Sequence, residues 1–271
     1  MRLVDGMRFA VGTLSVFPVR GERVDRVVAG QAMILAPAVG VVLGTVAGLP
    51  LFLPVPALLG AALALGLLAV LTRGLHLDGL ADLADGLGSG KPADEALAIM
   101  KKSDIGPFGV MALVFTLLVQ VVALAEAGFA ALVTACLAGR IMLTWACRTR
   151  VPAARPDGLG AMVAGTVRPS APWLVTLAAL LASAAVGLTV DLRTWDRPAE
   201  PAGELTSWVT DAGLGLPAFL TLPAGLLAGL GAAMLLLRRA GRRLGGITGD
   251  VLGALVETAT AGVLVMCAVL G

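Results

Sequence analysis

Long runs of apolar residues, separated by short polar segments, dominate this chain. Residues 27–72 contain no charged side chain, and two proline-containing segments, Leu49-Pro50 and Pro54-Val55-Pro56, divide this run. A helix needs about 20 apolar residues to cross a hydrocarbon core about 30 Å thick. The pattern predicts seven membrane-spanning helices, at residues 30–52, 56–73, 107–126, 128–147, 171–190, 217–237 and 251–270.

The first sixteen residues have an amphipathic pattern instead. Apolar side chains recur on one face of a helix and charged side chains on the other, which is typical of a short helix lying at a membrane surface. We expect residues 1–26 to form a cytoplasmic amphipathic segment, although a soluble amphipathic helix would have the same pattern. The apolar face consists of Leu3, Met7, Val11 and Leu14, and the charged face of Arg2, Asp5 and Arg8.

The composition also indicates a protein that lies in a bilayer. Of the 271 residues, 58% are hydrophobic and 14% are charged, and the mean hydropathy is +0.94. Because a soluble domain carries about 25% charged residues, these values exclude a soluble globule, a disordered chain and a nucleic-acid-binding arm. We therefore predict an all-α, polytopic integral membrane helix bundle that forms one domain, residues 1–271, with no nucleic-acid partner.

The positions of the basic residues predict the orientation of the chain. Four segments hold 17 of the 20 basic residues, and all four fall on one side of the membrane if the spans alternate. Lys and Arg are enriched on the cytoplasmic side, so we expect a multi-pass protein of the plasma membrane with a cytoplasmic N-terminus. The loop at 191–216 has only two basic residues against five acids. The four segments carry Arg2, Arg8, Arg20, Arg23 and Arg26; Arg73, Lys91, Lys101 and Lys102; Arg148, Arg150, Arg155 and Arg168; and Arg238, Arg239, Arg242 and Arg243.

The segment after the second predicted span carries the most informative acids. Asp78, Asp82 and Asp85 are spaced i, i+4 and i+7, which places them on one face of a helix. Like charges at this spacing destabilise a helix, and acids near a membrane are costly, so the stripe favours a bound cation. Carboxylates without cysteine indicate a hard ion such as Mg²⁺. The alternative is that residues 74–106, a predicted cytoplasmic loop, present these acids only as a solvated face.

Three further charges lie inside predicted spans or at the start of one. Asp250 and Glu257 are seven residues apart, and Arg140 lies several residues inside the fourth span. An intramembrane Arg is a candidate partner for phosphate or carboxylate. Asp250 has a simpler alternative role, as an acid stabilised by a helix N-terminus. Metal-binding acids combined with Lys and Arg on one side of the membrane indicate phosphoryl transfer.

Four segments of the chain resemble the motifs of one family. The run Arg73-Gly-Leu-His-Leu-Asp-Gly-Leu-Ala-Asp-Leu-Ala-Asp-Gly86 is similar to the signature of cobalamin synthases, the membrane-embedded adenosylcobinamide-GDP ribazoletransferases of bacteria and archaea. Residues 13–19, 99–109 and 245–253 resemble the N-terminal, central and C-terminal motifs of that family. One departure is Lys102, where the family often has an acid; here the acid is Asp104.

The resemblance implies a reaction and its participants. The 5′-oxygen of α-ribazole, or of its 5′-phosphate, would attack the cobinamide-linked phosphorus of adenosylcobinamide-GDP, and GMP would leave. The implied cofactor is Mg²⁺, and the active site would be cytoplasmic in a cell inner membrane. A second copy of the chain is a further candidate partner.

The residues in the matching motifs, and the charges beside them, form the predicted site. His76 or an aspartate would orient or deprotonate the nucleophile, and Lys101 with an arginine would hold phosphate oxygens. The predicted metal ligands are Asp78, Asp82, Asp85 and Asp104; the predicted catalytic residues are His76, Asp82, Lys101 and Arg140; and the predicted substrate-binding residues are Arg73, Ser103, Arg148, Gly249, Asp250 and Glu257.

Two alternatives assign the acids differently. A CDP-alcohol phosphotransferase also displaces a nucleoside monophosphate with stacked aspartates, but its Asp-Gly-x-x-Ala-Arg pattern with a later Gly-x-x-x-Asp is missing here. An ion-coupled transporter would have its acids near the bilayer midplane, whereas most acids here are predicted at the cytoplasmic surface. Both alternatives rank below the ribazoletransferase.

Overall fold

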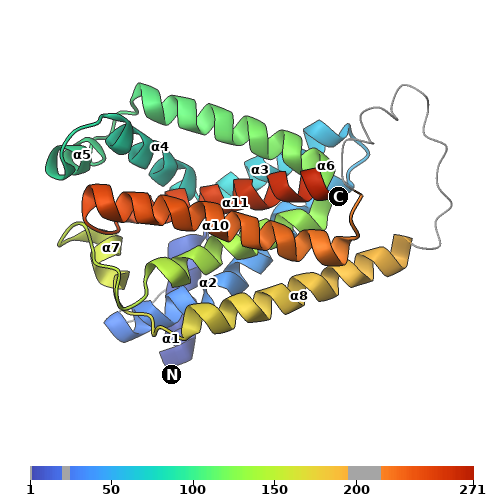
Figure 1. Cartoon of the computed structure of the whole chain (residues 1–271), viewed down its shortest axis with the longest axis horizontal. Coiled ribbons are helices and arrows are strands. Elements are labelled where there is room, and N and C mark those ends of the chain that lie inside the picture. Colours follow the sequence, from blue (N-terminus) through green and yellow to red (C-terminus); the bar gives the residue numbers. More distant parts are fainter. Residues whose placement is uncertain (1, 20–24, 195–214) are drawn as a thin grey trace.

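The computed structural model describes residues 2–19, 25–194 and 215–271, and apart from two isolated β-bridges every named element in these ranges is a helix (Figure 1). The all-α class predicted from the apolar runs is therefore confirmed. The elements are α1 (Arg2–Leu14), α2 (Arg26–Ala47), the 3₁₀ helix η1 (Leu49–Phe52), α3 (Ala57–Leu71), α4 (Leu75–Gly88), α5 (Ala93–Ile99), α6 (Pro107–Ala146), α7 (Gly158–Val163), α8 (Ala171–Thr194), α10 (Ala218–Leu244) and α11 (Gly249–Leu270).

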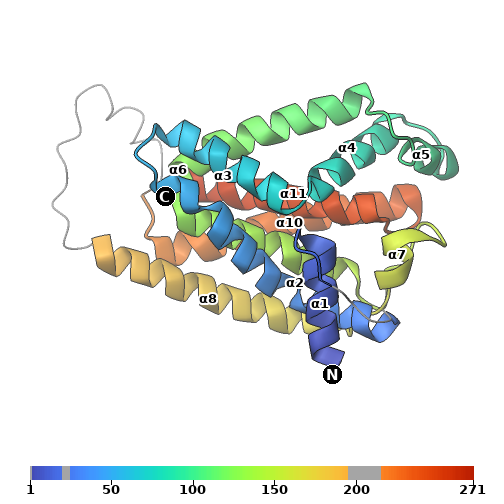
Figure 2. The ribbon, with the colours of Figure 1, turned by 180° about the vertical axis from the view of Figure 1, so that it is seen from behind.

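Helix α6 is one 40-residue element that folds back on itself. A straight helix of that length would extend about 60 Å, twice the thickness of a hydrocarbon core. Gly128 interrupts it with φ 75° and ψ −170°, a conformation that glycine adopts without a steric penalty. Gln120 bonds to Glu257, while Gly139 packs against the neighbouring Val256. The two halves therefore lie along the same part of α11, as Figures 1 and 2 show, and the turn falls where the sequence predicts the break between two spans.

Within the described residues, five helices are long and apolar enough to cross a membrane: α2 with η1, α6, α8, α10 and α11. Helices α3 and α4 pass the same test only as a pair, and they are bent by 89° relative to each other. The chain is thus a multi-pass membrane helix bundle. The two halves of α6 and the α3–α4 pair are the structural candidates for the remaining crossings, and the number seven stays a prediction.

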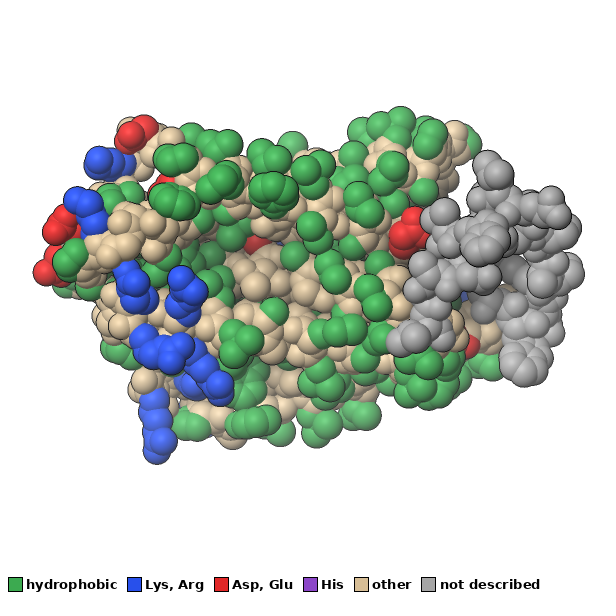
Figure 3. Space-filling model, turned by 45° about the horizontal axis from the view of Figure 1, so that its top comes forward, with side chains coloured by type: hydrophobic (Ala, Val, Ile, Leu, Met, Phe, Trp, Pro, Cys, Tyr) green, Lys and Arg blue, Asp and Glu red, His purple; other side chains and the backbone are tan. Residues whose placement is uncertain are grey.

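Helix α11 is the centre of the bundle, and the outer surface of the bundle is apolar. The residues of α11 that face α6 and α10 are almost completely buried. On the outside, Phe115 is 66% exposed and Trp173 is 67% exposed. An exposed apolar surface of this extent is unfavourable in water and suits contact with lipid. Figure 3 shows apolar side chains over the middle of the molecule.

Charged side chains gather at one end of the molecule, where α4, α5, α7 and the C-terminal part of α10 meet (Figures 1 and 3). We call this region the charged end. Arg243 near the end of α10 donates to the backbone carbonyl of Lys91, which joins two of the basic segments. Most of the predicted site residues lie at this end, and several of the basic segments meet there too.

The amphipathic first segment forms helix α1, which packs against α2. Ala10 and Leu14 are buried, whereas Leu3 remains 66% exposed. The backbone N–H of Val16 donates to the carbonyl of Leu71, 2.7 Å away, and so connects this segment to the end of α3. The helix is confirmed, and its position at a membrane surface stays a prediction. Arg20 and Arg23 lie outside the described residues.

The acid-rich loop predicted at 191–216 lies mostly outside the described residues. At its near edge, Asp191 accepts hydrogen bonds from the backbone N–H groups of Ala218 and Phe219 at 2.8 and 3.0 Å. This carboxylate therefore satisfies free amides in the first turn of α10.

Candidate active site

Helix α4 crosses the first turns of α11 at very short distance. The chain enters α4 through Arg73 and Gly74, both with positive φ, which redirects it by 89° after α3. A Cβ atom at Gly79 would lie 2.8 Å from the carbonyl oxygen of Asp250, and one at Gly253 would lie 3.1 Å from the carbonyl oxygen of His76. The glycines of two separate motifs therefore allow the two backbones to touch. We call this region the α4–α11 crossing.

The crossing brings the two predicted groups of acids together. Asp78 is exposed, Asp82 is half-buried and Asp85 is buried, so the stripe runs from solvent into the bundle. The Asp82 carboxylate interacts electrostatically with Asp78, Asp85 and Asp250. Residues 172 positions apart along the chain thus share one electrostatic environment, and such a concentration of negative charge favours a cation or a cationic side chain nearby.

Asp85 has a structural partner of its own. Its two carboxylate oxygens accept hydrogen bonds from the backbone N–H groups of Gly106 and Gly109, at 2.7 and 2.9 Å. These amides belong to the first turn of α6, where a negative charge is favourable. A Cβ atom at either glycine would collide with the carboxylate. Asp85 therefore attaches α4 to the start of α6, and its metal-ligand role stays a prediction.

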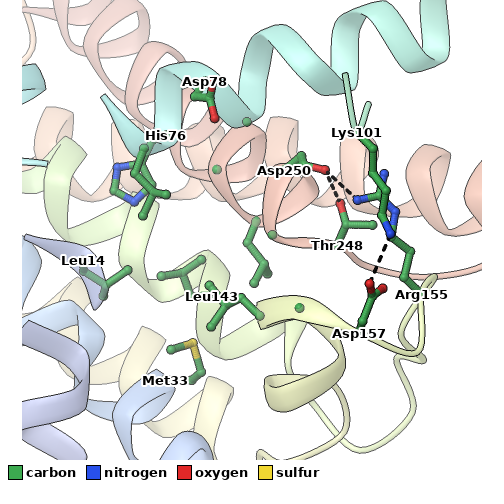
Figure 4. Close-up of a pocket in the computed structure, with 17 residues that line it drawn as sticks. Leu14, Met33, His76, Asp78, Lys101, Leu143, Arg155, Asp157, Thr248 and Asp250 are labelled. Atoms are coloured by element: carbon green, nitrogen blue, oxygen red, sulfur yellow. Dashed lines mark hydrogen bonds and ion pairs between the residues drawn. The ribbon is translucent and has the colours of Figure 1, made fainter. Parts of the chain in front are cut away.

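A cavity of about 300 Å³ opens beside the crossing. Its inner end is apolar and is formed by buried side chains from four different helices, namely Leu14, Met33, Leu143 and Leu252, together with His76. Figure 4 shows Leu14, Met33 and Leu143 on one side and the charged residues on the other. We call this space the first cavity. It combines an apolar interior with a small number of polar groups, which is typical of a small-molecule site.

Hydrogen bonds and ion pairs fix the polar mouth of the first cavity. Thr248 caps α11 by accepting from the N–H of Val251 at 3.2 Å, and its hydroxyl donates to Asp250. Arg155 pairs with Asp250 at 3.5 Å. Lys101 pairs with Asp157 at 3.1 Å, and the hydrogen bond from Lys101 holds the pKa of Asp157 below its usual range. The carboxyl group of Asp157 is therefore ionised at neutral pH.

Sequence reasoning missed Arg155, Asp157 and Thr248 as site residues. The position of Thr248 could have been predicted from the sequence, because threonine is a favoured N-cap residue and this one lies just before a predicted helix. The other two lie in a loop whose position depends on long-range contacts. The N–H of Ile247 donates to the carbonyl of Pro152, and the N–H of Ala154 donates to that of Ile247, at 2.9 Å each. These bonds hold the loop against the motif that precedes α11.

A second cavity, of about 270 Å³, lies further along the acidic stripe, toward the C-terminal end of α4. Asp82 and Asp104 line it together with Lys102 and Ser89, whereas Asp78 and Asp250 line the first cavity. The stripe therefore extends along both cavities, with Asp78 at the first and Asp82 and Asp85 at the second, and Asp82 interacts electrostatically with Asp78 and Asp250 of the first. In the described part of the chain, no three His, Cys, Asp or Glu side chains are close enough to enclose a metal ion by themselves.

The comparisons with known proteins agree with this arrangement. A family model described as cobalamin-5-phosphate synthase matches residues 6–268. The chain belongs to this family. It is 42% identical to an adenosylcobinamide-GDP ribazoletransferase of Frankia casuarinae, over 96% of this chain and 93% of the relative. The corresponding enzymes of Nocardioides sp. and Corynebacterium efficiens are 39% and 36% identical, over 96% and 98% of this chain and 96% and 92% of the relatives.

Membership of the cobalamin-5-phosphate synthase family confirms the resemblance read from the four motifs and identifies the chain as a transferase enzyme. No solved structure matches the chain. The geometry of the site in this family member is therefore described from its own residues.

Two charged residues predicted for this family member lie behind the first cavity instead of lining it. Arg140 is only 1% exposed, and its Nε and Nη2 have no hydrogen-bond partner within the described ranges. Glu257 accepts from Nε2 of Gln120 at 2.9 Å and interacts electrostatically with Arg140. We call Arg140, Glu257 and Gln120 the interior cluster. It joins both halves of α6 to α11 inside the bundle, and Gln120 was not predicted.

The remaining predicted residues are distributed over the charged end. Gly249 lines the first cavity, and Lys101 stands at its mouth. Arg73 donates to the carbonyl of Gly12 at 3.3 Å, and Ser103 is exposed between α5 and α6. The guanidinium of Arg148 lies 5.4 Å from the centre of the Trp145 ring and lines neither of the two cavities. The substrate-binding roles of these residues stay predictions.

Proposed function

We propose that this protein is an adenosylcobinamide-GDP ribazoletransferase of cobalamin biosynthesis. It transfers the adenosylcobinamide-phosphate group to α-ribazole or to α-ribazole 5′-phosphate and releases GMP. The family match and the names of the full-length relatives support this activity. The structural observation that carries it is the α4–α11 crossing, where the acids of two motifs meet between two cavities with Lys101 and Arg155 beside them.

The chemistry requires charge neutralisation and positioning. The product named in the family description keeps a 5-phosphate, so the nucleophile is a free ribose hydroxyl of the acceptor and not the 5′-oxygen expected from the sequence. This hydroxyl forms a bond to the cobinamide-linked phosphorus, and the bond from this phosphorus to the oxygen of the GMP leaving group breaks. Asp82, which lines the second cavity and interacts electrostatically with Asp78 and Asp250 of the first, orients the attacking hydroxyl, whose proton passes to a carboxylate of the crossing. Lys101 and Arg155 hold phosphate oxygens, which offsets the negative charge that develops as GMP leaves.

The carboxylates of the crossing fit a magnesium ion that is completed by substrate. Mg²⁺ is usually bound through one or two carboxylates together with phosphate oxygens, so a preformed set of three protein ligands is not needed. Asp78 and Asp82 would hold the ion, with Asp104 on the far side of the second cavity. When bound, Mg²⁺ neutralises charge on the diphosphate. Asp85 is already occupied by the amides of α6.

The test of the activity uses purified protein in lipid nanodiscs. Adenosylcobinamide-GDP, α-ribazole and MgCl₂ are added, and GMP and the corrinoid product are measured together by liquid chromatography. We expect equal amounts of both products, and no turnover after chelation with EDTA until Mg²⁺ is restored. A parallel reaction with α-ribazole 5′-phosphate compares the two acceptors. Absence of GMP with substrate stocks that a characterised enzyme consumes would contradict the activity.

We also propose that the charged end faces the cytoplasm of a bacterial cell, across its plasma membrane. The excess of Lys and Arg at this end supports that orientation. All three native cysteines are buried, so they should not react with a maleimide in the folded protein. Single cysteines introduced at Ser103 and Glu126, which are both exposed, therefore show on which side of the membrane each position lies. A membrane-impermeant maleimide should label Glu126→Cys in intact spheroplasts and Ser103→Cys only after permeabilisation. The opposite pattern would reverse the orientation.

A further inference from the structure

The first cavity has a shape and a chemistry that suit one of the two substrates better than the other. Its volume is about 300 Å³, at the lower limit for small-molecule sites. A corrin ring with its amide side chains is several times larger and cannot enter. The acceptor, a ribose attached to dimethylbenzimidazole, is a small molecule with one flat apolar end and one polar end.

The inner end of the cavity matches the apolar end of such a molecule. Leu14, Met33, Leu143 and Leu252 are each no more than 3% exposed and present only carbon and sulfur atoms. A guanine base would leave several ring-edge donors and acceptors unpaired against this surface, at a considerable cost in affinity. A benzimidazole has one polar ring atom, the nitrogen N3, that needs a partner.

One buried polar atom is available for that nitrogen. His76 is 3% exposed and lines the cavity, and its Nε2 has no hydrogen-bond partner among the residues that the structure describes. A buried imidazole nitrogen without a partner is unusual, because buried polar groups are nearly always paired. Since a neutral imidazole carries one N–H, His76 can donate that hydrogen to the free ring nitrogen. Figure 4 shows His76 above the apolar side chains.

The polar mouth matches the ribose. Asp250, Thr248 and Arg155 are held in fixed positions by the ion pair and the hydrogen bonds around the start of α11. They face the same cavity as the apolar side chains, so a ligand with its base inside has its ribose at the α4–α11 crossing. The free hydroxyls of the ribose then lie near Asp82, which lines the second cavity, and a larger donor can present its phosphate from that cavity.

We infer that the first cavity is the acceptor subsite: its apolar inner end and the Nε2 of His76 bind the benzimidazole, and the mouth binds the ribose. This inference rests on the proposed transferase function. The donor then approaches from the second cavity, at the exposed surface of the charged end. His76 becomes a residue that recognises the base, and an aspartate of the crossing orients the nucleophile.

The experiment measures acceptor binding without donor, and then the two Michaelis constants separately. Leu143→Ala removes apolar contact inside the cavity. Leu132→Ala is its control, because Leu132 is also buried in the second half of α6 but does not line the cavity. We expect Leu143→Ala to weaken α-ribazole binding and raise its KM about fifty-fold with the donor KM unchanged, since about three carbon groups lose contact. Leu132→Ala should change neither constant.

A second series tests the hydrogen bond from His76. The acceptor analogue is the ribosylated dimethylindole, which has a C–H group in place of ring nitrogen N3. The wild type should bind this analogue about ten-fold more weakly than α-ribazole, whereas His76→Phe should bind the two compounds equally, because a double-mutant comparison isolates the pair. A discrimination that persists in His76→Phe would overturn the assigned contact.

The outcomes separate the inference from the proposed function. If the wild type shows no GMP release but its α-ribazole affinity depends on Leu143 and His76, the transferase function fails and the subsite stands. If turnover is intact and both cavity variants change the donor KM, or leave α-ribazole binding unchanged, the acceptor subsite is wrong and the transferase function stands.

Discussion

The α4–α11 crossing and the interior cluster both contain charged residues inside an apolar molecule, yet their surroundings differ. At the crossing, Asp78 and Asp82 reach solvent or a cavity, and Lys101 and Arg155 stand beside open space. In the interior cluster, Arg140 and Glu257 are buried and line neither cavity. The comparison teaches that a charged residue in a predicted span does not by itself indicate contact with a ligand. Access to a cavity is what distinguishes the acids and bases of the crossing from the buried charges of the interior cluster.

The largest expected effect is loss of activity at the crossing. Asp82→Asn should reduce kcat about a hundred- to a thousand-fold with the fold intact, because removing one preorganised polar group that acts in the transition state typically costs roughly 10²–10³ in rate. The measurement is GMP release, with thermal unfolding recorded on the same preparation. Glu126→Gln, which removes an exposed acid at the distant bend of α6, is the matched control and should retain full activity. Normal turnover in Asp82→Asn would remove this residue from the mechanism.

Substitutions in the interior cluster should lower the stability of the fold more than they lower activity. Arg140→Met removes the cationic side chain that interacts electrostatically with the buried Glu257, and leaving a buried charge uncompensated costs about 3 kcal/mol in stability. The double variant Arg140→Met with Glu257→Met should recover most of the loss, since no uncompensated charge remains. Thermal unfolding in nanodiscs measures both. If Arg140→Met unfolds like the wild type but loses turnover, Arg140 belongs with the crossing.

Asp85 lines the second cavity and also accepts hydrogen bonds from the start of α6, and its variants decide between a metal-binding and a structural role. If it serves only the amides of Gly106 and Gly109, Asp85→Ala should lower stability by about 1–2 kcal/mol, the value of a helix cap with buried donors. The Mg²⁺ concentration that gives half-maximal activity should stay the same. Asp78→Asn is the comparison variant, and we expect it to require more Mg²⁺. If Asp85→Ala requires more Mg²⁺ for half-maximal activity, the predicted role of Asp85 as a metal ligand is supported.

The sequence could predict the features that depend on local periodicity. The helical spacing of Asp78, Asp82 and Asp85, and the break in the apolar run next to Gly128, are both present in the structure. The partner of Asp85 and the position of Arg155 could not be predicted, because each depends on a contact between segments far apart in the chain. Glycine residues in the motifs indicated these contacts only indirectly. Gly79, Gly106 and Gly253 each mark a place where two segments touch.

The smallest expected effect concerns the ion pair between Lys101 and Asp157, which is fully at the surface. Asp157→Asn should leave the fold unchanged and alter the donor KM no more than about two-fold, because exposed pairs contribute little. The lowered pKa of Asp157 means that the carboxylate supports the pair above its ordinary pKa of 3.8 and loses it as pH falls further. The effect of Asp157→Asn should therefore be the same at pH 6 and pH 8.

Lys101→Met is the other half of this test. If Lys101 holds phosphate oxygens at the mouth of the first cavity, its loss should raise the donor KM about ten-fold, an effect typical of one charge-assisted hydrogen bond. That effect should shrink in high salt, because the side chain is exposed to screening ions. If Lys101→Met and Asp157→Asn both change the donor KM only slightly, the ion pair is no more than a surface contact. Among the described residues that line the first cavity, Arg155 would then be the remaining positive charge that can act on phosphate.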